Sequence, residues 1–282
     1  MFQTIIGAVS SFMYSKLLVI ILIGAGLYFT IRTRFPQVRL FERACESVME
    51  KPDDKEAISS FQALMVSTAS RVGTGNIVGV SSAICIGGFG SVFWMWVIAI
   101  IGSASALIES TLAQIYKKKG EDGKCYGGPA YYIEAALHCR PLAIVFCIAM
   151  ILTYAFGFNM LASYNLQSTF SGQPFYNAEI TPWIIGGILA LVTGWCLLGG
   201  GNRIVKVTST LVPFMGIVYI LISLLVVVLN IGQLPSVLAQ IFEEAFDFKA
   251  IFAGFAGSAM MQGIRRGLYS NEAGIGSAPN AA

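Results

Sequence analysis

Long apolar stretches separated by short polar segments dominate the sequence. A helix that crosses a bilayer needs about 20 predominantly apolar residues, and each of these stretches comes close to that length or exceeds it. The pattern therefore predicts seven membrane spans, at residues 17–30, 58–86, 91–116, 142–169, 183–198, 207–230 and about 250–264. Between them we expect a turn with a short helix after residue 127 and an amphipathic helix over 234–248. The whole pattern is typical of an all-α polytopic membrane protein.

The composition supports this class and excludes several others. Of the 282 residues, 56% are hydrophobic and 12% are charged, whereas soluble domains carry about 25% charged residues. A soluble enzyme, a disordered region and a disulfide-stapled secreted module are therefore excluded. The net charge of +3 is too small to indicate a nucleic-acid partner.

The basic residues fall in alternate loops. They are concentrated after the first, third and fifth spans and at the end of the seventh, at residues 32–55, 117–140, 203–206 and 265–266. The intervening loops contain no lysine or arginine before Lys249. Because cytoplasmic loops are enriched in these residues, we expect an outside N-terminus, cytoplasmic basic loops and a location in the cell (plasma or inner) membrane. The first span is followed, not preceded, by arginines, which is the reverse of a signal peptide.

The sequence lacks the residue sets of common catalytic and metal centres. Its six cysteines are scattered without a CxxC pair, and His138 is the only histidine. No Ser/His, Cys/His or transition-metal ligand set is recognisable. We therefore expect neither an enzyme nor a transition-metal protein.

The second span contains a candidate binding site. Residues 58–86 would form a continuous helix of about 43 Å, which is longer than the bilayer core of about 30 Å. Gly73 and Gly75 lie in its middle and are followed by Asn76. Glycine allows the chain to leave helical dihedrals, and an unwound turn offers N–H groups to a carboxylate and carbonyls to a small cation. The alternative is an unbroken helix in which Gly75 and Gly79 form a GxxxG packing face.

Two charged residues at membrane depth have alternative roles. Arg71 lies beside the predicted break, where it either neutralises a carboxylate or extends along its helix towards the inner face. Glu109 lies in the third span, about 10 Å from its end. Its carboxylate serves either as a proton or cation relay or as a structural partner for a loop N–H or an arginine.

Polar and small residues also interrupt the fourth and seventh spans. Asn159 and Ser163 share a helix face because they are four residues apart, and Phe158 is a candidate wall of a small pocket. Hydrogen bonding between helices is the alternative role for these polar residues. Gly257 and Ser258 lie in the seventh span, and the small and polar residues after it are not expected to form a lipid-facing helix. Two glycine-interrupted spans separated by intact ones are typical of an inverted-repeat transporter.

Five motifs together resemble the alanine/glycine:cation symporter family. They are SRVGTGNIVGV at 70–80, FWMW at 93–96, LAQIYK at 112–117, GGPAYY at 127–132 and RGLYSNEAG at 266–274. The resemblance implies a secondary active transporter that carries small neutral amino acids such as alanine and glycine across the bilayer by alternating access. It implies sodium as the coupling ion, with protons as the alternative, and no further cofactor or required protein partner.

The resemblance also implies a fold and a set of binding residues. The fold is the leucine-transporter-like inverted repeat of five plus five helices, with an extra N-terminal helix. Substrate contacts are expected at Gly73, Thr74, Gly75, Asn76, Phe158, Asn159, Ser163, Gly257, Ser258 and Asn271, and cation contacts at Val72, Thr74 and Asn76. Many family members carry Gln-x-Asn in the fourth span, where this chain has Ala162 and Tyr164.

The same resemblance divides the chain into parts. We expect a single transmembrane domain over 1–282, with an extra N-terminal helix and basic loop at 1–45, a first five-helix repeat at 57–230, and an external loop with the start of a second repeat at 231–282. Members of the family continue much further, so the second repeat is expected to be incomplete here. A transport-inactive membrane fragment is therefore an alternative. An ion channel is disfavoured because no filter-like repeat is recognisable.

Overall fold

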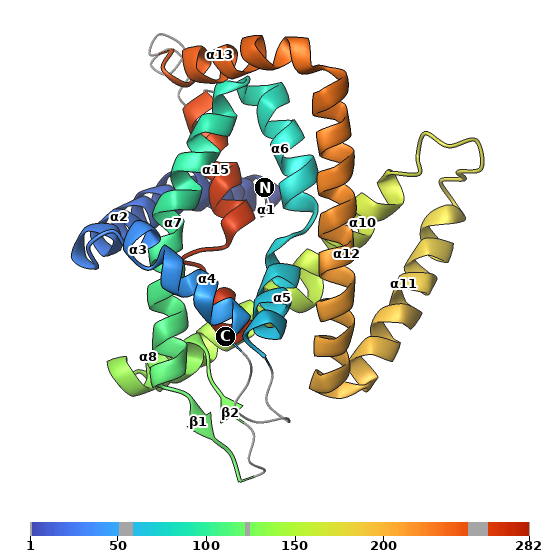
Figure 1. The fold of residues 1–282 in the computed structure, drawn as a ribbon. Helices are drawn as coiled ribbons and strands as arrows, with labels where there is room; N and C mark the ends of the chain where they lie inside the picture. Colours follow the sequence, from blue (N-terminus) through green and yellow to red (C-terminus); the bar gives the residue numbers. More distant parts are fainter. Residues whose placement is uncertain (1, 51–58, 122–124, 248–258, 282) are drawn as a thin grey trace.

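Helices make up nearly all the regular structure of the chain. The computed structural model describes residues 2–50, 59–121, 125–247 and 259–281, and within these ranges the elements are helical apart from one short hairpin. Figure 1 shows long upright helices with shorter helices crossing them. The all-α prediction is confirmed.

The N-terminal helix runs without a break from Phe2 to Arg32. Its segments are α1 (Phe2–Phe12), the π-helix η1 (Met13–Leu17) and α2 (Leu18–Arg32). The helix predicted at 17–30 is therefore present, but α2 is shorter than a bilayer-spanning helix and runs crosswise to the upright helices in Figure 1. Two short helices follow, α3 (Pro36–Arg39) and α4 (Phe41–Met49).

The second predicted span consists of two helices. α5 (Ser60–Arg71) begins with a capping box, in which the side chains of Ser59 and Gln62 each accept a hydrogen bond from the other residue's backbone N–H. α6 (Thr74–Gly87) follows after a short extended link, and Figure 1 shows the two helices arranged end to end. The predicted break is confirmed, and the alternative of one unbroken helix is wrong.

The third span is α7 (Gly90–Ile115), and a hairpin and a short helix follow it. The strands β1 (Lys118–Lys119) and β2 (Cys125–Tyr126) pair antiparallel; the hydrophobic pattern does not predict them. α8 (Pro129–Leu137) is the short helix expected after residue 127. It begins where Gly128 adopts a φ of 108°, a conformation that favours glycine.

The fourth, fifth and sixth predicted spans are long helices. They are α9 (Arg140–Ile151) continued by the π-helix η2 (Leu152–Phe158) and α10 (Asn159–Ser168), then α11 (Thr181–Leu198), then α12 (Gly200–Leu229). The predicted start of the sixth span at residue 207 is wrong, because α12 begins at Gly200. With a φ of 70°, Gly200 lets the chain reverse directly after α11. Arg203 and Lys206 therefore lie inside a helix instead of in a loop.

The amphipathic helix predicted at 234–248 crosses the end of α7. It is α13 (Leu234–Ala245), which follows a turn of 3₁₀ helix, η3 (Ile231–Gln233), and Figure 1 shows it above α7 and α6. The Trp94 indole N–H donates to the Ala245 carbonyl at 2.9 Å. Phe93 packs edge-on against Phe242 and Phe246, with ring centres 5.7 and 5.0 Å away.

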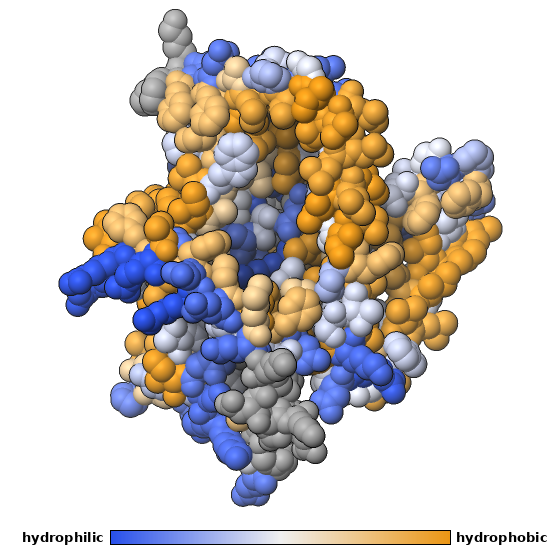
Figure 2. All heavy atoms as spheres, viewed as in Figure 1, coloured by the Kyte–Doolittle hydropathy of each residue, from blue (hydrophilic) through white to orange (hydrophobic). Residues whose placement is uncertain are grey.

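Much of the helical surface is apolar and exposed. Within the described ranges, four helices are long and apolar enough to cross a membrane: α7, α9–η2–α10, α11 and α12. On α11, Trp183 is 82% exposed and Leu198 is 90% exposed. Figure 2 shows broad hydrophobic surfaces, with hydrophilic residues gathered towards the end that holds the β1–β2 hairpin. Apolar surface of this extent requires lipid or protein to cover it.

The buried core lies between α2, α7 and α15 (Ala259–Asn271). Its main cluster comes from these three helices: Val19, Leu22, Ile98, Met261, Ile264 and Leu268. α15 approaches α7 closely at Gly263 and Gly267. A Cβ added at Gly263 would overlap the Ser91 carbonyl oxygen, and one added at Gly267 would lie 3.1 Å from the Ile98 Cβ.

The predicted end of the seventh span at residue 264 is wrong, because the helix continues to Asn271. The added residues do not form a lipid-facing helix, in agreement with the prediction, because α15 is buried against α7 and α6. Glycine at 263 and 267 allows this close approach. The first part of the predicted span, residues 250–258, lies outside the described residues.

Candidate functional site

The link between α5 and α6 releases backbone groups from helical hydrogen bonding. Val72 and Gly73 are extended, with φ/ψ of −82°/92° and −133°/−163°. The Asn76 N–H donates to the Gly73 carbonyl at 3.1 Å, and the Asn76 side-chain amide donates to the Arg71 carbonyl at 3.2 Å. Asn76 thus satisfies a carbonyl that the break exposes. The N–H groups at the start of α6 have no partner further back in that helix.

A second break follows α15. After Asn271 the residues Glu272, Gly274 and Gly276 have φ values of 50°, 88° and 83°, before the short helix α16 (Ala278–Ala281). Glycine adopts this conformation without strain, whereas Glu272 is held in it by its surroundings. Glu272 is 4% exposed, and its carboxylate accepts a hydrogen bond from the Tyr154 hydroxyl at 3.2 Å.

Side chains connect the two breaks to each other and to α7. The Ser270 hydroxyl of α15 donates to the Asn76 side-chain oxygen. Glu109 of α7 accepts a hydrogen bond from the Gly274 backbone N–H at 3.2 Å, and Arg71 is near enough for its charge to act on Glu109. The Gly274 bond matches one of the two roles predicted for Glu109, that of a structural partner for a loop N–H.

The fourth span contributes a π-helix to the same region. A π-turn widens a helix locally and is frequent at functional sites. Tyr154 and Phe158 lie on η2 and stack with each other at 4.9 Å between ring centres, and Phe158 stacks with Tyr269 of α15 at 5.7 Å. These three rings, which we call the aromatic wall, join the fourth span to α15.

A cavity of about 330 Å³ lies where the first break, the fourth span and the end of α15 meet. Its lining is Ala69, Ser70, Arg71, Val72, Gly73, Asn76, Phe158, Asn159, Leu161, Ala162, Tyr269 and Glu272. Pockets for small ligands have volumes from about 300 Å³ upward. The lining combines a cationic side chain, a carboxylate, a helix N-terminus and aromatic rings, so it can bind a small molecule that carries both charges.

The cavity brings together part of the predicted site. Val72, Gly73, Asn76, Phe158 and Asn159 all line it. The backbone of Thr74 and Gly75 forms the first turn of α6.

The other predicted residues lie elsewhere. Ser163 is on α10 but not in the lining. Asn271 is engaged in other bonds: its amide donates to the Ile98 carbonyl at 3.2 Å, and its oxygen accepts from the Ala273 N–H at 3.0 Å. Gly257 and Ser258 lie outside the described residues.

Sequence reasoning missed two members of the cavity, the carboxylate of Glu272 and the ring of Tyr269. Glu272 and Tyr269 lie within the motif that follows the seventh span, and the signal that could have found Glu272 is a carboxylate in an apolar chain with few charges. The π-helix leaves no recognisable signal in the hydrophobic pattern. Within the described ranges, no three His, Cys, Asp or Glu side chains gather as a metal site.

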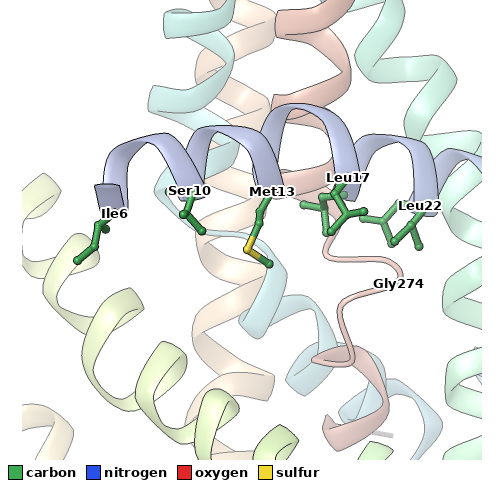
Figure 3. A pocket seen from close by; sticks show the side chains of 9 residues that line it. Ile6, Ser10, Met13, Leu17, Leu22 and Gly274 are labelled. Atoms are coloured by element: carbon green, nitrogen blue, oxygen red, sulfur yellow. The ribbon is translucent and has the colours of Figure 1, made fainter. Parts of the chain in front are cut away.

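A second, larger groove is a poor candidate for binding a charged small molecule. It has a volume of about 630 Å³ and lies beneath the N-terminal helix (Figure 3). The side chains that line it are apolar apart from Ser10. Figure 3 shows Ile6, Met13, Leu17 and Leu22 along one side of the helix, with Gly274 near the Leu22 end. The groove offers no charged group to an amino acid.

Known proteins share sequence with the whole chain. A sequence profile of the sodium:alanine symporter family matches residues 1–282. The amino-acid carrier protein AlsT of Bacillus subtilis is 45% identical over 100% of this chain and 59% of its own length. The probable sodium/glutamine symporter GlnT of the same organism is 44% identical over 99% of this chain and 58% of its own.

An archaeal relative extends the similarity. The sodium/alanine symporter AgcS of Methanococcus maripaludis is 37% identical over 100% of this chain and 63% of its own length. The chain thus spans about three fifths of the length of these curated relatives. With a profile match along its full length and apolar helices that are long enough to cross a membrane, this all-α chain belongs to the sodium:alanine symporter family of membrane transporters.

Proposed function

We propose that the protein forms the substrate-holding part of a sodium-coupled symporter for small neutral amino acids such as alanine and glycine. The observation that carries the proposal is the cavity where the broken helix α5–α6 meets the fourth span and the end of α15. Substrate and ion sites of many secondary transporters form at discontinuous helices. The names of the relatives, a sodium/alanine and a probable sodium/glutamine symporter, support sodium as the coupling ion and an amino acid as the cargo.

The groups around the cavity suit the two charged ends of an amino acid. The N-terminal turn of α6 offers the backbone N–H groups of Thr74 and Gly75 and the positive end of a helix dipole to a carboxylate. Glu272 offers its carboxylate to the ammonium group. The aromatic wall then limits the room for the side chain, which favours glycine and alanine over leucine and phenylalanine. Asn159 supplies a further polar contact in the lining.

We assign the sodium site to the same break. The Val72 carbonyl and the side-chain oxygens of Thr74 and Asn76 are neutral oxygen donors, the ligand type that hard cations prefer. The alternative, proton coupling, would depend on Glu109. Its bond to the Gly274 N–H favours a structural role for that carboxylate, and therefore favours sodium.

The proposed transport mechanism is alternating access in a leucine-transporter-like inverted repeat. In this scheme residues 57–230 form the first repeat, residues 231–282 open the second, and 1–45 are an extra N-terminal segment. The proposed orientation in the plasma or inner membrane has the N-terminus outside and the basic loops, including the β1–β2 hairpin, in the cytoplasm. It follows from the distribution of lysine and arginine.

Binding of labelled alanine in sodium and in potassium tests the proposal. A Cβ at Gly73 would meet no described atom within 4 Å, and its φ of −133° suits any residue. Gly73→Leu therefore places bulk in the cavity without straining the backbone. We expect the protein to bind alanine in sodium only, and Gly73→Leu to lose at least about tenfold in affinity, equivalent to about 1.4 kcal/mol.

Gly194→Leu is the matched control, because Gly194 lies on α11, away from the cavity, and is also free of described neighbours within 4 Å. It should bind like the unaltered protein. Equal binding by Gly73→Leu and Gly194→Leu would contradict the assignment of the cavity. Uptake of labelled alanine into vesicles under an inward sodium gradient, compared with uptake without sodium, then separates a transporting protein from the alternative of a binding fragment that does not transport.

A further inference from the structure

The corner between α11 and α12 holds a basic side chain in a fixed position. Gly199 separates the two helices, and Arg203 folds back from the first turn of α12 onto the end of α11. Its Nη1 donates to the Trp195 carbonyl at 2.8 Å, and its Cζ lies 4.9 Å from the centre of the Trp195 ring. Gly199 permits this arrangement, because a Cβ there would overlap the Arg203 side chain.

A groove of about 510 Å³ begins at this corner and follows α12. Arg203 and Lys206 lie at its start, and Val207, Leu211 and Phe214 continue along the same side of the helix at spacings of three and four residues. From Arg203 to Phe214 the groove extends about 16 Å along the helix axis. Its apolar part is open to the surroundings, since Leu211 is 57% exposed and Phe214 is 66% exposed.

The charged side chains of the two helices that form this corner are all positive. Arg203 and Lys206 are the only charged residues between positions 181 and 229. Figures 1 and 2 show the corner at the same end of the molecule as the β1–β2 hairpin, where hydrophilic residues gather. Arg203 and Lys206 therefore lie at the edge of an apolar surface, and the groove extends from them along that surface.

We propose that this groove binds one anionic phospholipid. The phosphate group lies between Arg203 and Lys206, and an acyl chain lies along Val207, Leu211 and Phe214. Arginine presents five N–H donors, so the bond to Trp195 leaves others for phosphate oxygens while holding the guanidinium at the lipid boundary. Basic pockets between membrane helices on the cytoplasmic side bind anionic headgroups, and tryptophan is enriched at that interface. This site is separate from the cavity of the proposed transport function.

Native mass spectrometry of the purified protein, titrated with phosphatidylglycerol or phosphatidylcholine, tests this site. We expect one phosphatidylglycerol to bind in preference to phosphatidylcholine. In Arg203→Gln/Lys206→Gln its affinity should fall about thirtyfold, the equivalent of about 2 kcal/mol for the loss of two cations near an anionic headgroup. The matched control, Lys118→Gln/Lys119→Gln on β1, removes the same charge from an exposed hairpin and should leave the affinity unchanged.

A third variant tests the acyl part of the groove without altering its charge. Leu211→Trp fills the groove at an exposed position and retains both cations, so it should also displace the bound phosphatidylglycerol. Equal loss of affinity in the two charge variants would overturn the proposal in favour of general surface attraction. Undiminished binding in Leu211→Trp, or equal affinity for phosphatidylcholine, would overturn it as well.

Discussion

At the scale of single residues, Asn76 joins the first break to α15 through its side chain. Its amide donates to the Arg71 carbonyl, and its oxygen accepts from Ser270. Asn76→Ala removes both bonds and leaves a partly buried carbonyl without its partner, which costs about 1 kcal/mol or more. We expect a lower thermal unfolding midpoint in detergent, together with loss of sodium-dependent alanine binding measured by exchange of sodium for potassium.

Glu109→Gln is the informative comparison for Asn76→Ala. Glutamine keeps a side-chain oxygen that can accept from the Gly274 N–H, which Glu109 does now. If the carboxylate is a structural partner, sodium dependence should persist in this variant. The opposite pattern, with coupling abolished by Glu109→Gln and retained by Asn76→Ala, would make proton coupling the better account.

The bond between Tyr154 and Glu272 joins the fourth span to the second break. A hydrogen bond to a charged group contributes about 1.5–3 kcal/mol. Tyr154→Phe keeps the stacked ring but removes the donor from Glu272. We expect a lower unfolding midpoint and weaker alanine binding. Tyr164→Phe, at a position that is 64% exposed, should change neither; similar losses in both variants would show that the Glu272 bond is not the cause.

At the scale of elements, the contact between α15 and α7 depends on the absence of side chains. Gly263→Ala places a methyl group against the Ser91 backbone carbonyl, and neither helix can yield without disturbing the core, so we expect destabilisation of about 1–3 kcal/mol. Gly194→Ala on α11 meets no described atom within 4 Å and should be neutral or stabilising by up to about 1 kcal/mol. Chemical unfolding in mixed micelles measures both, and equal midpoints would refute the packing argument.

The helices could be predicted from the sequence where local chemistry decides the structure. The long spans follow from the length of their apolar stretches, and the break in the second follows from glycines in a stretch too long for one helix. The end of α15 and the start of α12 could not be predicted. Tertiary packing keeps residues 265–271 helical. The positive φ of Gly200 lets the chain reverse there, so that α12 begins early enough to include Arg203.

The candidate site could be predicted only in part for a related reason. Gly73 and Asn76 are visible as small and polar residues within an apolar span, and both line the cavity. Glu272, which lines the cavity, has a positive φ. Tyr154 and Phe158 lie on a π-helix, from which Phe158 stacks with Tyr269. Neither conformation leaves a periodic trace in the sequence, because each depends on a few residues held by neighbours from other helices.

At the scale of the whole molecule, the proposed orientation predicts which surfaces a membrane-impermeant reagent can reach. Cys125 on β2 is exposed and is assigned to the cytoplasm. Ser236 on α13 is exposed at the opposite end and is assigned to the outside. In a background without other cysteines, a charged maleimide should label Ser236→Cys in intact cells and Cys125 only after permeabilisation. Labelling of Cys125 in intact cells would reverse the orientation.

The burial of α7 against α15 also has a consequence for the order of events during synthesis. The polar partners of α7 at Gly90, Ile98 and Glu109 lie 154 to 173 residues further along the chain. At about 5–20 residues per second, they are made roughly eight to thirty-five seconds after the residues of α7 that they contact. Throughout that interval the Glu109 carboxylate stands in the nascent protein without the N–H group of Gly274. Helix α11, whose surface faces outward, has no such delay. Failed assembly is therefore expected to begin at α7, and a chaperone of nascent membrane helices would protect the protein most by shielding that helix.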